Sequence, residues 1–119
     1  ILLPYTAQNH HTIGAAEIAM MKPTATLINI ARGGIVDDAA LAKALQSGKI
    51  FAAGLDVFEG EPQVHPELLK CSNIVLAPHI ASATEKTRRA MVDLAVENLR
   101  AALDGKKPPS LINAEVFKA

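Results

Sequence analysis

Residues 26–58 read TLINIARGGIVDDAALAKALQSGKIFAAGLDVF, and this stretch decides the fold class. It opens on a short apolar run, residues 26–30, which is followed by Gly33 and Gly34. The next segment is rich in helix-forming residues, and Asp37 or Asp38 can cap its N-terminus. Gly48 is suited to end that helix, and a second apolar run follows it. The predicted order is therefore strand, helix, strand.

Further elements are expected on both sides of this stretch. Upstream, residues 2–5 resemble the end of a buried strand, and residues 15–21 are helix formers that stop before a proline. Downstream, residues 66–69 suggest a short helical turn, and residues 73–77 form a third apolar run that ends at a proline.

The last predicted element is a long helix. Residues 82–85 read SATE, which matches a capping box, and Gly105 is suited to end the helix. Apolar side chains recur between these limits at helical spacing. They are Val92, Val96, Leu99 and Leu103.

The predicted strands are apolar throughout and do not alternate with polar residues. This pattern is typical of strands buried on both faces, and therefore of a parallel sheet with helices on each side. The fold class expected from the sequence is α/β.

Composition restricts the possible partners. The 119 residues contain 12 basic and 12 acidic side chains, so no electrostatic feature predicts binding to nucleic acid or to a membrane surface. No apolar run approaches the roughly 20 residues of a membrane helix. The single cysteine, Cys71, cannot form an internal disulfide, which favours a cytoplasmic protein. Because the chain starts with Ile1 in an apolar run, we expect it to be a piece of a longer protein.

Ionisable residues follow the predicted strands at the edge where ligands bind in open parallel sheets. Arg32 follows the first strand of the quoted stretch, Asp56 lies at the end of the second, and His79 follows the third. Glu61 lies in the loop after the second strand, within reach of the same edge. Each of these residues could also be an ordinary surface or loop residue.

This set of residues would suit the reduction of a 2-oxo acid. Arginine can bind the carboxylate through two parallel hydrogen bonds and help to polarise the neighbouring ketone. Protonated histidine can deliver a proton to the alkoxide that forms when hydride arrives from a nicotinamide. A carboxylate beside the histidine, for which Glu61 is the candidate, would stabilise its charged form.

Three motifs carry a resemblance to a known family. They read NIARGGIVD at residues 29–37, AGLDVFEGEP at 53–62 and PHIASAT at 78–84. In type, order and spacing they resemble the arginine, aspartate–glutamate and histidine motifs of the D-isomer-specific 2-hydroxyacid dehydrogenases. The segment HHTIG at residues 10–14 is most similar to the glyoxylate/hydroxypyruvate and 2-ketogluconate reductases of that family.

The resemblance implies a fold of two Rossmann-like domains with the active site between them. Residues 1–80 would then be the C-terminal half of the NAD(P)-binding domain, with its parallel sheet and flanking helices. Residues 81–119 would be a long interdomain helix and the tail of the substrate domain. The pyrophosphate-binding G-x-G-x-x-G turn does not occur in this sequence and is expected upstream. We therefore expect the chain alone to lack tight cofactor binding and turnover.

The resemblance also assigns roles to residues. Arg32 would bind and polarise the substrate, His79 would be the acid/base, and Glu61 rather than Glu59 would be its partner. Asp56 would hydrogen-bond the carboxamide of the nicotinamide. The cofactor, NAD or NADP, is expected to contact Pro4, Thr6, Ile30, Ala31, Arg32, Asp56, His79 and Ala81.

Other interpretations stay open at this point. Transcriptional corepressors that resemble this family keep the fold and the catalytic trio, so the chain could belong to a dinucleotide-sensing module without turnover. It could also be an inactive half-domain. Members of the family are usually homodimers, which is the expectation for the full-length protein. His10, His11 and His65 show no ligand pattern, so no metal site is expected, and Cys71 is expected to be packing.

Overall fold

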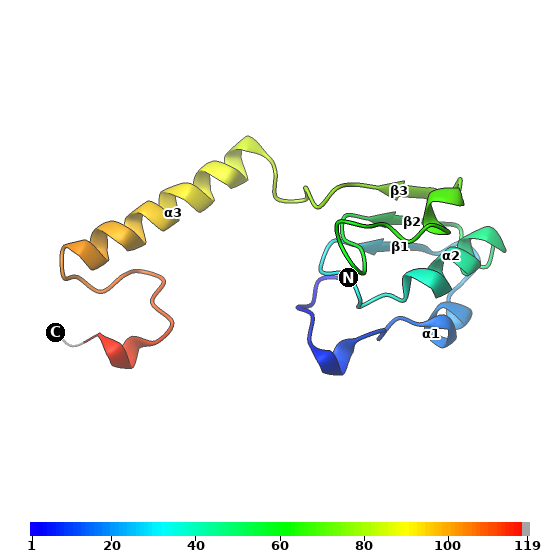
Figure 1. Cartoon of the computed structure of the whole chain (residues 1–119), viewed down its shortest axis with the longest axis horizontal. Helices are drawn as coiled ribbons and strands as arrows, with labels where there is room; N and C mark the ends of the chain where they lie inside the picture. Colours follow the sequence, from blue (N-terminus) through cyan, green and yellow to red (C-terminus); the bar gives the residue numbers. More distant parts are fainter. Residues whose placement is uncertain (118–119) are drawn as a thin grey trace. The chain divides into compact units, whose positions relative to one another are not determined.

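The computed structural model describes residues 1–117 and divides the chain into two compact units, Ile1–Ala81 and Ser82–Ala119. The first unit contains a three-stranded parallel sheet in the order β1-β2-β3 (Figure 1). Its strands are β1 (Thr26–Asn29), β2 (Ala52–Leu55) and β3 (Ile74–Leu76). The predicted parallel α/β sheet is confirmed.

Two helices and two 3-10 turns accompany these strands: η1 (Ala7–Asn9) and α1 (Ala15–Met20) precede β1, α2 (Asp38–Gln46) lies between β1 and β2, and η2 (Leu68–Lys70) lies between β2 and β3. Asp37 caps α2, because its side chain accepts a hydrogen bond of 2.9 Å from the backbone N–H of Ala40. Gly48 follows the helix with a φ of 69°, the left-handed conformation that ends helices.

The core of the first unit lies on one face of the sheet, where α1 and α2 pack (Figure 1). A strand order that runs in one direction places right-handed connections on the same face, because nearly all parallel crossovers share that hand. The large side chains of this core include Ile18, Leu27, Val36, Leu41, Leu45, Ile50, Leu55, Phe58 and Leu68.

The expectation that both faces of the sheet are buried is wrong for the described chain. Residues of β1 alternate between exposed and buried, and Ile28 is 47% exposed. On β3, Val75 is 71% exposed. Apolar strands predict two covered faces, but the connections within this chain supply helices to only one of them.

The predicted strand at residues 2–5 is also not formed. A single hydrogen bond of 2.7 Å joins the amino group of Ile1 to the carbonyl oxygen of Ile28, and residues 1–6 have no regular secondary structure. Pro4 has no N–H to donate, so this segment cannot continue a ladder along β1.

The second unit contains α3 (Glu85–Leu103), as predicted, and the 3-10 turn η3 (Ala114–Val116). The cap of α3 is Thr84 and not Ser82, because the Thr84 hydroxyl accepts a hydrogen bond of 3.2 Å from Thr87 N–H. The apolar residues at helical spacing are exposed within this unit. The assignment of residues 81–119 to an interdomain helix and substrate domain stays a prediction. Within residues 1–117, no helix combines the length and the hydropathy that crossing a bilayer requires.

The core predicts where the fold is most sensitive to truncation. Leu41 in α2 is fully buried, whereas Leu69 in η2 is 64% exposed. We expect Leu41→Ala to lower the free energy of unfolding by about 2–5 kcal/mol, because it leaves a cavity in the core. Leu69→Ala is the matched control and should change it by less than about 0.5 kcal/mol. Urea unfolding followed by circular dichroism measures both, and equal effects would contradict this account of the core.

Candidate active site

Arg32 is positioned by a buried asparagine at the end of β1. The side chain of Asn29 donates a hydrogen bond of 3.1 Å to the carbonyl oxygen of Arg32 and accepts one of 3.1 Å from Ala31 N–H. It is only 2% exposed. Sequence reasoning did not single out Asn29. The available signal was an asparagine at a strand end, where its side chain can form a local turn with the backbone.

A glycine brings the loop of Arg32 against the segment that follows β2. A Cβ atom at Gly33 would lie 1.8 Å from the carbonyl oxygen of Phe58 and 2.7 Å from the backbone nitrogen of Glu59. Any side chain at this position would collide with backbone atoms that cannot rotate away. Gly33 therefore permits the close approach that joins two of the predicted motifs.

Glu61 and His79 are within hydrogen-bonding distance, in the arrangement that an acid/base histidine needs. Nδ1 of His79 lies 2.7 Å from Oε2 of Glu61, and Oε1 of Glu61 accepts a hydrogen bond of 2.9 Å from Phe58 N–H. Nε2 of His79 has no hydrogen-bond partner within residues 1–117. The glutamate thus holds one ring nitrogen, and the other remains available to a ligand.

The pKa of Glu61 reflects these contacts. Burial alone would raise the pKa of its carboxyl group, but the hydrogen bonds with His79 and Phe58 outweigh burial and lower it below 4.5. The carboxylate of Glu61 is therefore charged at neutral pH.

Asp56 fixes the loop that carries His79. Its two carboxylate oxygens accept hydrogen bonds of 2.7 Å each from the backbone N–H groups of Ile80 and Ala81. The Asp56 side chain is buried, and His79 beside it has a φ of 55°, a left-handed conformation that is uncommon outside glycine. Such a conformation persists when its surroundings hold it, and Asp56 and Glu61 do so from two sides.

The predicted catalytic trio lines one cavity. A surface pocket of about 350 Å³ is bordered by Arg32, Glu61 and His79, together with Tyr5 and His10. These side chains come from three loops that follow β1, β2 and β3 and from the segment before α1. The structure thus brings together the three residues that the sequence predicts to act on substrate.

A second pocket, of about 590 Å³, shares Tyr5 and Arg32 with the first. Of the residues expected to contact the cofactor, Pro4, Ile30, Ala31 and Arg32 line this second pocket. The other residues do not line it. His79 lines the first pocket, and Thr6 N–H donates a hydrogen bond to the side chain of Asn9. The carboxylate of Asp56 accepts a hydrogen bond from Ala81 N–H. Their contacts with a cofactor stay predictions.

Comparison with known proteins agrees with this geometry. Residues 1–81 match the family described as "D-isomer specific 2-hydroxyacid dehydrogenase, NAD binding domain". The chain belongs to this family. The match covers the first two motifs and the third as far as Ala81. It also covers the whole of the first unit, which holds the two pockets.

Individual members of the family are similar along nearly the whole chain. Glyoxylate reductase of Thermococcus gammatolerans is 51% identical over 118 residues, covering 99% of this chain and 35% of the relative. Glyoxylate/hydroxypyruvate reductase B of Pectobacterium atrosepticum is 52% identical, covering 99% and 37%. The structure of an NADPH-dependent glyoxylate/hydroxypyruvate reductase from Sinorhizobium meliloti in complex with NADP and malonate superimposes with a TM-score of 0.86, at 42% identity, covering 99% and 37%. This chain therefore spans little more than a third of the length of these dehydrogenases.

Because the pKa of Glu61 is lowered in the folded state, we expect this residue to contribute to stability in a way that depends on pH. A carboxyl whose pKa is lower in the folded state stabilises the fold above its unfolded pKa of 4.5, and the effect is lost as pH falls through the folded pKa. Glu61→Gln should therefore lose stability relative to wild type at neutral pH, and the difference should shrink below pH 4.5. Thermal unfolding at a series of pH values measures this. A difference that grows as pH falls would contradict the contacts described.

Proposed function

We propose that this chain is part of an NAD(P)-dependent oxidoreductase that transfers hydride between the reduced cofactor and a small 2-oxo acid, with the D-2-hydroxy acid as the product. The observation that carries the proposal is the cavity lined by Arg32, Glu61 and His79. The names of the similar dehydrogenases point to glyoxylate or hydroxypyruvate as the substrate. 2-Ketogluconate is the further candidate from the sequence resemblance.

The side chains of this cavity can perform the proton chemistry of the reaction. The guanidinium group of Arg32 binds the substrate carboxylate and polarises the adjacent ketone. Nε2 of protonated His79 delivers a proton to the oxygen of that ketone as negative charge develops there. Glu61 holds the His79 ring through the contact of 2.7 Å with Nδ1, which leaves Nε2 for the substrate. In the oxidation direction, the same Nε2 accepts the proton.

The second pocket fits the nicotinamide end of a dinucleotide. Ile30 and Ala31 border it with the Pro4 segment and offer an apolar wall for a flat ring. Tyr5 and Arg32 line both this pocket and the one lined by His79, so a ring and a substrate bound in the two pockets would be neighbours. When bound, the cofactor supplies the hydride. NAD and NADP both remain candidates, since their distinguishing contacts lie at the adenosine end.

Further features of the working protein belong to the same proposal. Because the chain covers about 35% of its relatives, we place the activity in a longer protein and expect the 119-residue chain alone to lack turnover. The family resemblance supports a homodimer. A cytoplasmic location is supported by the single free cysteine, Cys71, which is half-buried and whose thiol pKa burial raises.

The test is a turnover assay on the full-length protein that contains this chain. Oxidation of NADH and of NADPH would be followed with glyoxylate, hydroxypyruvate and 2-ketogluconate. The proposal expects turnover with at least one of these 2-oxo acids. Cofactor binding without turnover on any of them would instead support the dinucleotide-sensing alternative. Calorimetry on the isolated chain tests its expected lack of tight cofactor binding, and sedimentation of the full-length protein tests the homodimer.

A further inference from the structure

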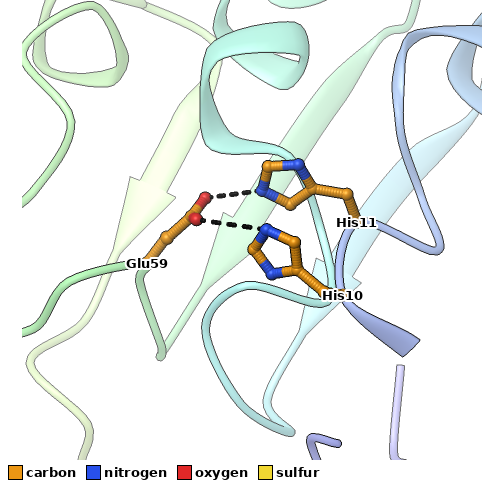
Figure 2. Close-up of side chains that lie close together, drawn as sticks. All are labelled: His10, His11 and Glu59. Carbon is orange, nitrogen blue, oxygen red and sulfur yellow. Dashed lines mark hydrogen bonds and ion pairs between the residues drawn. The ribbon is translucent and has the colours of Figure 1, made fainter. Parts of the chain in front are cut away.

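Two adjacent histidines, His10 and His11, meet a distant glutamate, Glu59 (Figure 2). His10 and Glu59 also line the pocket that holds the catalytic trio. Nε2 of His11 lies 2.8 Å from Oε2 of Glu59, and Nε2 of His10 lies 3.8 Å from Oε1 of the same carboxylate. The two imidazole rings are stacked, with centroids 3.8 Å apart and an angle of 21° between their planes. The proposed reaction uses Glu61 and His79 and leaves these three residues without a role.

The backbone is bent to bring the two rings together. Side chains of consecutive residues point in opposite directions along an extended chain. His11 instead has a φ of 51°, a left-handed conformation that is uncommon for residues other than glycine. Its backbone N–H donates a hydrogen bond of 2.7 Å to the carbonyl oxygen of Gly34, which holds this conformation. The resulting turn directs both Nε2 atoms toward the Glu59 carboxylate, as Figure 2 shows.

The inner nitrogens of the two rings face oxygen atoms. Nδ1 of His10 lies 3.2 Å from the hydroxyl of Tyr5, and Nδ1 of His11 lies 3.9 Å from Oδ2 of Asp37. Histidines that bind a metal through one nitrogen usually direct the other at such an oxygen, which fixes the ring and its tautomer. His10 therefore has both the outer donor and the hydrogen-bonded inner partner of a metal ligand, and His11 has the outer donor and a carboxylate 3.9 Å from its inner nitrogen.

We propose that His10, His11 and Glu59 bind one divalent transition-metal ion of the zinc class. Two imidazoles and one carboxylate are a ligand set that zinc accepts, with a fourth position left for water. The donor atoms lie within 4.8 Å of one another, and side-chain rotations that also turn the two rings out of their stacked arrangement would bring them to the roughly 3.3 Å that separates donors on one zinc ion. The side chains of His10 and Glu59 are 43% and 40% exposed, so an ion can enter from solvent.

The sequence alone predicts no metal site, because Glu59 lies 48 residues after His11 and no short ligand pattern links them. Only the contact between the turn after η1 and the loop after β2 creates the cluster. Without a metal, the hydrogen bond between His11 and Glu59 joins these two segments. Metal titration distinguishes a metal-binding site from a purely structural contact.

The experiment titrates the full-length protein with Zn²⁺ in competition with a chromophoric chelator, and repeats the titration with Co²⁺, whose visible spectrum reports its ligands. We expect one ion per chain. His10→Ala, His11→Asn and Glu59→Gln should each weaken zinc binding by about tenfold or more. Asparagine is used at position 11 because it tolerates the left-handed backbone. Circular dichroism checks that each variant is folded.

Two control variants locate the ion. His65→Ala removes a histidine outside the cluster, and His79→Ala removes the other histidine–carboxylate pair. Both should bind zinc as tightly as wild type does. The proposal is overturned if wild type binds no zinc, if the three cluster variants keep wild-type affinity, or if His79→Ala alone loses the ion.

Discussion

Replacing His79 by asparagine is expected to lower kcat of the full-length protein on its 2-oxo acid by about 10²–10⁴-fold, the usual contribution of a positioned general acid. Asparagine cannot deliver a proton from a charged ring, but it tolerates the left-handed backbone that His79 adopts, with a φ of 55°. The loop should therefore keep its place. Steady-state kinetics with NADH and NADPH measure the change.

The effect should be specific to proton transfer. Asp56 holds the loop through the backbone of Ile80 and Ala81, and these contacts do not involve the His79 ring. Cofactor affinity, measured by fluorescence titration, should therefore change little in His79→Asn. His65→Asn is the matched control and should keep its kcat. An unchanged kcat in His79→Asn would contradict the acid/base role of His79.

The parts of this fold that the sequence predicts are those determined by local interactions. The helix α2 depends on Asp37 at its start and Gly48 after its end, and both signals lie within the segment itself. The three strands of the sheet are apolar runs between turn residues, so their existence can be predicted, although their exact ends cannot. The four site residues follow strands, and parallel strands place such residues at one edge.

The parts that the sequence does not predict depend on distant partners. Residues 2–5 have the apolar character of a strand, but the segment gains only one hydrogen bond to the sheet, from Ile1. Only one face of the sheet is buried, because the connections within this chain place helices on that face alone. The apolar pattern of the strands does not show on which face the helices lie. The role of Asn29 depends on the exact turn it supports. The cluster around Glu59 depends on a contact across 48 residues.

Gly33→Ala is expected to lower the free energy of unfolding by more than about 3 kcal/mol, beyond the usual range for an added methyl group in a packed site. The new Cβ would lie 1.8 Å from the carbonyl oxygen and 2.2 Å from the carbonyl carbon of Phe58. Both atoms belong to the backbone, so the clash can be relieved only by separating the two loops. Urea unfolding measures the loss, or the soluble yield does if the variant fails to fold.

A second glycine separates this steric effect from backbone strain. Gly48 has a φ of 69°, but no atom lies within 4 Å of the position that an added methyl group would take, so Gly48→Ala should cost only the roughly 1–2 kcal/mol of a left-handed alanine. An equal loss in the two variants would show that the loops do not touch at Gly33. If the loops do touch there, any Gly33→Ala protein that folds must hold Arg32 away from the segment between Phe58 and Glu61. Its kcat/KM for the 2-oxo acid should then fall together with its stability, whereas Gly48→Ala should lose stability alone.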